Sequence, residues 1–113
     1  MDQNIKDFLV AEELTRANEI HGDTFPSVEH GMTVLREEVE EVEEQTIKIR
    51  KQYDLFWQGY REGLVLEEEM EHMEIHAERL IDEAIQILAM CEKYRKSNLV
   101  QTGSMEDFLE IEK

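Results

Sequence analysis

Residues 35–44 read LREEVEEVEE, an acidic run laid over regularly spaced apolar positions. Apolar or small side chains recur at alternating spacings of four and three through this region: Val28, Met32, Leu35, Val39, Val42, Thr46 and Ile49. An α-helix turns by about 100° per residue, so this spacing places all of them on one face. The pattern therefore predicts a long amphipathic helix that packs along this face.

Two glutamates of the acidic run lie nearer to the apolar stripe than a fully solvated face requires. By helical phase, Glu38 falls roughly 70° from the centre of the stripe and Glu41 roughly 130° on the same flank. Glu37 and Glu44 point away from the stripe. A glutamate-rich helix most often only solvates a surface, and that interpretation stays open for this run by itself.

Length and composition indicate one all-α domain. The chain has 113 residues, of which 41% are hydrophobic, and this fraction argues against disorder although 35% are charged. With one proline and five glycines, the chain has few helix-breaking residues, which favours long helices. We expect a helical bundle of long antiparallel helices, with residues 1–96 as a single domain and residues 97–113 as a tail that contains a short helix.

The predicted helices cover residues 3–21, residues 28 to 53 or somewhat beyond, and residues 65–96. Ser27 is the expected cap of the second helix. Gly59 and Gly63 interrupt an aromatic segment, so the sequence predicts the second turn within residues 53–64.

The third predicted helix has an unusually wide apolar face. One row of side chains follows a regular pattern of three and four: Met70, Met73, Ala77, Leu80, Ala84, Ile87, Cys91 and Tyr94. A second row comprises Ile81, Ile85 and Leu88. A helix of about 30 residues spans about 45 Å, which is long for a lone globule of this size. The sequence therefore predicts a homodimer or homotetramer that completes the bundle.

The net charge of −16 argues against direct binding to nucleic acid or to an anionic membrane, because both require a basic surface. A phosphate ligand stays compatible with this charge if metal ions mediate the contact. No apolar run is long enough for a membrane span, and the single Cys91 cannot form an internal disulfide. These features predict a cytoplasmic protein.

A second polar site follows on the third predicted helix. Glu83 lies at the border of the apolar face, with Gln86 one turn further on, and His72, His76 and Arg79 on the same flank. If the second and third helices pack antiparallel, Glu38 and Glu41 face Glu83. Three converging carboxylates repel one another unless a cation binds between them, so this arrangement predicts a metal site. Arg79 is a candidate phosphate contact beside Glu83.

His72 and His76 have the one-turn spacing of zinc ligands on a helix. No third ligand follows from the sequence, and a pair of surface histidines is the commoner arrangement.

The two acidic motifs together resemble a known family. The run Glu37-Glu38-Val39-Glu40-Glu41 matches the EExxE motif of the MazG-like, all-α nucleoside triphosphate pyrophosphohydrolases, and Glu83-Ala84-Ile85-Gln86 falls where that superfamily carries ExxD. The surroundings of both motifs resemble its phage and bacterial branch. The similarity covers roughly residues 25–95.

This resemblance implies an Mg²⁺-dependent enzyme, with Mn²⁺ as a substitute, that cleaves an NTP or dNTP between the α and β phosphates. Glu38, Glu41 and Glu83 would be metal ligands, and Gln86 would stand at the position of a fourth. Glu37, with Glu38, would be catalytic and would assist or hold a metal-bound water. Arg79 would contact the bound nucleotide.

The chain departs from the family pattern at Gln86, where the superfamily usually carries aspartate. An amide oxygen still coordinates a metal, but the change removes one negative charge and should weaken metal binding. The spacing is also longer than in compact members, since 41 residues lie between Glu41 and Glu83. The alternative interpretation is therefore a non-catalytic helical-bundle protein for binding or assembly, with a weakened metal site.

Overall fold

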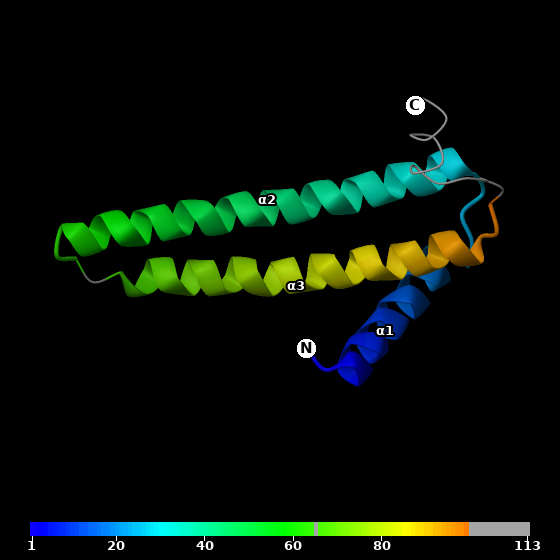
Figure 1. Cartoon of the computed structure of the whole chain (residues 1–113), viewed down its shortest axis with the longest axis horizontal. Helices are drawn as coiled ribbons and strands as arrows, with labels where there is room; N and C mark the ends of the chain where they lie inside the picture. The colour runs from blue at the N-terminus through cyan, green and yellow to red at the C-terminus, as the bar shows by residue number, and fades with distance from the viewer. Residues whose placement is uncertain (65, 100–113) are drawn as a thin grey trace, which may run out of the picture.

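The computed structural model describes residues 1–64 and 66–99, which form three α-helices and no strand. They are α1 (Gln3–His21), α2 (Val28–Arg61) and α3 (Glu67–Lys96) (Figure 1). The prediction of an all-α protein is confirmed for these residues. The short helix predicted in the C-terminal tail lies outside them. In the described part of the chain, no helix combines the length and the apolar character needed to cross a membrane.

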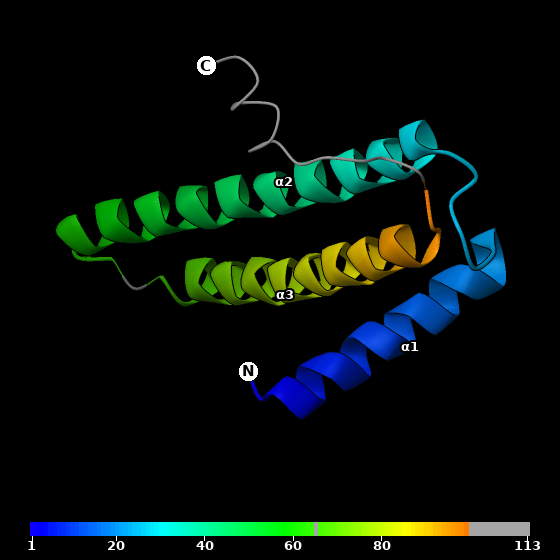
Figure 2. The ribbon, with the colours of Figure 1, turned by 45° about the vertical axis from the view of Figure 1, so that its right-hand side comes forward.

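α3 is the central helix of the fold. α2 and α3 lie side by side and run in opposite directions, while α1 packs on another side of α3 (Figures 1 and 2). The second apolar row of α3 faces α1: Ile81 and Ile85 line a groove together with Phe8 and Leu9. The wide apolar face predicted for this helix therefore has contacts with two neighbours, as expected from its two rows.

The helix boundaries follow from their capping residues. Asp2 accepts hydrogen bonds from the backbone N–H groups of Asn4 and Ile5 at the start of α1. α1 ends where Gly22 takes a positive φ of 84°. The Ser27 hydroxyl accepts a hydrogen bond from the His30 N–H at 3.1 Å, which confirms the predicted cap of α2.

α2 extends eight residues beyond Tyr53, the earliest predicted end, so the aromatic segment is helical. Gly59 remains within the helix, and a Cβ there would lie 1.9 Å from Leu66 Cδ1, so glycine allows the chain to pack closely after the turn. The helix ends at Arg61, and Gly63, the second residue after it, has a φ of 76°. The Leu64 N–H donates to the Gly59 carbonyl at 2.9 Å and the Gly63 N–H donates to the Tyr60 carbonyl at 3.1 Å, as in a Schellman motif.

The face of α2 that contacts α3 differs from the predicted stripe. Three predicted members are exposed to solvent: Met32, Val39 and Thr46. In their place, Gln45 is buried and Glu38 is partly buried. α3 offers polar partners to both side chains, so the helix pair buries a mixed polar and apolar face rather than the most apolar one. The contact face therefore includes the flank on which the sequence places Glu38, while part of the predicted apolar stripe faces solvent.

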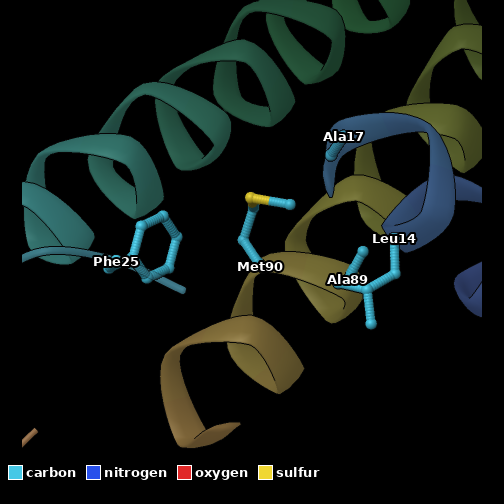
Figure 3. Close-up of a cluster of buried hydrophobic side chains, with 5 residues drawn as sticks. All are labelled: Leu14, Ala17, Phe25, Ala89 and Met90. Carbon is cyan, nitrogen blue, oxygen red and sulfur yellow. The ribbon is translucent and has the colours of Figure 1, made fainter. Parts of the chain in front are cut away.

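The buried hydrophobic side chains gather at one end of the fold, where α1 and the α1–α2 connection meet the second half of α3. They are Leu14, Ala17, Phe25, Ala89 and Met90 (Figure 3). The Phe25 N–H donates to the Ser97 hydroxyl at 2.7 Å, which in turn donates to the Lys93 carbonyl. The connection is thereby fixed to the end of α3, beside the predicted polar site.

Candidate metal centre

Three predicted carboxylates converge between α2 and α3. Glu38 and Glu41 lie one turn apart on α2, and Glu83 lies opposite them on α3. One oxygen from each side chain lies within 4.8 Å of the other two. Because the helices run in opposite directions, two motifs that are far apart in the sequence meet at the same level of the helix pair. Among the described residues, this is the group of acidic, histidine or cysteine side chains with metal-site geometry.

Gln86 joins the cluster as a hydrogen-bond donor. In the amide orientation that satisfies both ends of this side chain, its nitrogen donates to Glu38 Oε2 at 2.7 Å and to Glu83 Oε2 at 3.3 Å. An amide can either donate through its nitrogen or offer its oxygen to a cation. Gln86 therefore links the carboxylates of the two helices here, and a turn of the amide would direct its oxygen toward them.

The environment of the cluster disfavours negative charge. Burial raises the pKa of Glu38 to about 7, and the charges of Glu41 and Glu13 add to this effect. Burial likewise raises the pKa of Glu83 to about 7, with further contributions from the hydrogen bond and charge of Glu41. At neutral pH the two groups therefore hold protons for part of the time. A bound cation would displace these protons.

The donor set and its spacing suit a hard divalent cation. Mg²⁺ binds oxygen ligands at about 2.1 Å, so two ligands on opposite sides of one ion lie about 4.2 Å apart. The oxygens of the cluster all lie within 4.8 Å of one another, so small side-chain rotations bring them to separations of this order. Three carboxylate oxygens occupy only part of the octahedral coordination of Mg²⁺, so positions remain for water and phosphate, as in Mg²⁺ sites that act on nucleotides.

Two predicted site residues lie outside the cluster. Glu37 is exposed and does not belong to the group that could hold one cation, although it lines the same pocket as Glu38. Arg79 is exposed on α3 and lines none of the described pockets. Its charge lowers the pKa of His76, after the larger effects of burial and of Lys48. The structure therefore does not bring Arg79 to the carboxylates.

His76 has a structural partner instead of a metal. Its Nδ1 atom lies 3.0 Å from Oε1 of the buried Gln45, so this pair bridges α2 and α3 by a hydrogen bond. His72 is exposed and lies 3.9 Å from Glu68. Within the described residues, no third ligand completes a site with these two histidines.

A pocket of about 800 Å³ opens beside the carboxylates. It extends between the end of α1, the α1–α2 connection and the two long helices, and its lining includes Glu38 and Gln86. α1 contributes Glu13 and Arg16, which form an ion pair with each other. The sequence alone did not predict this contribution. Its only signal was the spacing of Glu13 and Arg16 around the buried Leu14 and Ala17, which brings them to the edge of the α1 contact face.

Comparisons of the chain with protein-family models, with curated proteins and with solved structures give no match.

Proposed function

We propose that this protein is an Mg²⁺-dependent nucleotide pyrophosphohydrolase of the MazG-like type, which cleaves an NTP or dNTP to an NMP and pyrophosphate. The observation that carries the proposal is the convergence of Glu38 and Glu41 from α2 with Glu83 from α3. These residues belong to the two motifs that resemble the family. The adjoining pocket of about 800 Å³ has room for a nucleotide beside the cluster.

In this proposal Glu38, Glu41 and Glu83 hold the cation, and Gln86 turns its amide oxygen inward. Bound Mg²⁺ would lower the pKa of the attacking water and neutralise charge on the phosphate oxygens. The water oxygen bonds to the α-phosphorus, the bond from that phosphorus to the α–β bridging oxygen breaks, and pyrophosphate leaves with its electron pair. Glu37 lines the pocket without joining the cluster, so we assign it the proton released by the water.

The first experiment is Mg²⁺-dependent pyrophosphate release across a panel of NTPs and dNTPs. Glu38→Gln should reduce the rate by at least about 100-fold, because it removes a charged ligand at the reacting centre. Glu44→Gln is the matched control: Glu44 is exposed on the same helix and pairs with Lys48 at 3.0 Å. Release that persists in Glu38→Gln, or that does not need a divalent cation, would contradict the proposal.

A non-catalytic bundle for binding or assembly is the second candidate. The observation that favours it is Gln86, whose amide satisfies the carboxylates by hydrogen bonds rather than by charge. A folded native protein that binds Mn²⁺ only weakly and releases no pyrophosphate from any nucleotide would support this function. Gln86→Asp should then strengthen metal binding.

We further propose that two copies of the chain associate through an exposed apolar face. On α2 this face is a row repeated every seven residues: Met32, Val39, Thr46, Tyr53 and Tyr60. The half-buried Leu35, Val42, Ile49 and Phe56 lie beside it at the spacing of a coiled coil. The row runs for about 40 Å along α2, which is long enough for a second helix pair to lie against it. A second copy of the same helix pair would complete the bundle.

The proposed location is the cytoplasm. Cys91 is a free thiol in the structure, as expected of a protein from a reducing compartment.

A further inference from the structure

Lys93 is a buried cation in a strongly acidic chain. It lies on the last turn of α3, and only 3% of its surface is exposed. Its ammonium group lies 4.9 Å from the centre of the Phe25 ring. Among residues 1–64 and 66–99, no carboxylate forms an ion pair with it. The Phe25 ring is thus the electrostatic partner that the described structure gives this ammonium group.

Burying an ammonium group without an opposite charge costs free energy. An ammonium ion loses its hydration when it is buried, and a single cation–π contact offsets only part of this cost. It also carries three N–H donors, which a ring face does not satisfy fully. Other cations of the same helix illustrate the usual arrangement: Lys96 is mostly exposed and pairs with Glu92 at 3.1 Å.

Lys93 lines the same pocket as the carboxylate cluster. Glu38 and Gln86 form one part of the wall, and Lys93 with Phe25 forms another. Lys93 follows Gln86 by seven residues, so the two lie on the same side of α3 and about 10 Å apart along its axis. The pocket therefore joins a group of oxygens suited to a cation with a buried, positively charged group about two helical turns away.

The geometry points to a phosphate-binding subsite at Lys93, which receives the end of a polyphosphate chain remote from the carboxylate cluster. This inference rests on the proposed function for the identity of the ligand as a nucleotide. An anion is the ligand that supplies the missing opposite charge, and its oxygens accept the ammonium N–H groups. Lys93 would thus favour triphosphates over monophosphates.

The test is calorimetric binding of NMP, of a non-hydrolysable α,β-methylene NTP and of inorganic tripolyphosphate to the Mn²⁺-loaded protein. Lys93→Met keeps an unbranched side chain that is one atom shorter and removes its charge. Lys96→Met is the matched control, with the same change of charge on the same turn but outside the pocket. Lys93→Met should weaken binding of the NTP analogue and of tripolyphosphate by at least about tenfold and leave NMP binding unchanged.

Thermal unfolding separates this role from a structural one. If Lys93 serves a ligand, Lys93→Met should not lower the Tm of the unliganded protein, because an unpaired buried charge is removed. A lower Tm with unchanged polyphosphate binding would overturn the inference. Equal weakening of NMP and the NTP analogue would also overturn it, because Lys93 would then contact the nucleoside. A third outcome is that the native protein binds tripolyphosphate but no nucleotide, and that Lys93→Met loses the tripolyphosphate binding. This outcome would support the phosphate subsite and contradict the proposed function.

Discussion

At the scale of single residues, Gln86 decides how the carboxylates of α2 and α3 are held together. Its amide reaches Glu38 and Glu83, so one neutral side chain joins two groups that would repel each other when ionised. An aspartate at this position would add a fourth carboxyl group to the cluster. The glutamine thus lowers the repulsion within the cluster, while it also lowers the charge available to a cation.

The raised pKa values of Glu38 and Glu83 predict an unusual dependence of stability on pH. Both values lie near 7 in the folded protein, compared with 4.5 for an ordinary glutamate, so the folded state binds more protons between these values. The free energy of unfolding should therefore fall as pH rises from about 4.5 to about 7 in the absence of divalent metal. Chemical unfolding at several pH values in a chelator measures this slope.

The control for this prediction is Glu83→Gln, which removes one titrating group and should flatten the slope. Saturating Mg²⁺ should reverse it, because the cation binds the deprotonated carboxylates and stabilises the folded state more as pH rises. Without metal, the stability of the native protein could instead rise with pH through this range, as much as that of Glu83→Gln. That result would contradict the raised pKa values of Glu38 and Glu83.

At the scale of the helices, the sequence predicted the existence and the boundaries of the helices better than the face of α2 that contacts α3. The Ser27 cap and the boundaries of α1 follow from local chemistry, and the structure confirms them. The sequence left the end of α2 open within residues 53–64, because the Schellman motif at Gly63 depends on which of two glycines takes a positive φ. Helical phase could bring Glu38 near the contact face. It could not show that Gln45 is buried, because this depends on its partner His76 across the helix pair.

Gly31 illustrates a constraint that only the packed helices reveal. A Cβ at this position would lie 2.7 Å from Tyr94 Cδ2 and 3.2 Å from Phe25 Cδ2. Gly31→Ala should therefore destabilise the protein by about 1–3 kcal/mol, although alanine favours a helix by about 1 kcal/mol over glycine. Urea unfolding of the two proteins tests this. An increase in stability would show that the rings of Tyr94 and Phe25 do not pack against α2.

At the scale of the whole molecule, the chain is too elongated to bury its apolar side chains alone. Its radius of gyration is 19.0 Å, compared with about 13 Å for a compact protein of this length. Met32 is 56% exposed and Val39 is 43% exposed, and both lie on the face that we assign to a second copy. Helix length predicts self-association from the sequence, and the exposed row on α2 is the face that we propose for it.

Val39→Glu should convert the proposed dimer to a monomer, because it places a charge within the apolar row. Light scattering after size-exclusion chromatography measures the mass directly. Ile5→Glu is the control, since Ile5 is exposed on α1, outside the α2 row. Higher ionic strength should strengthen association, because the two copies carry a charge of −16 each. If the native protein is monomeric at all salt concentrations, the proposed dimer interface on α2 is contradicted.

The measurement that tests the central claim most directly is Mn²⁺ binding, followed by electron paramagnetic resonance, in the native protein, Glu83→Gln and Glu44→Gln. If Glu38, Glu41 and Glu83 form the metal centre, Glu83→Gln should weaken Mn²⁺ binding by at least about tenfold, and Glu44→Gln should bind as the native protein does. Equal binding by all three proteins would place the cation elsewhere on the acidic surface and contradict the proposed centre.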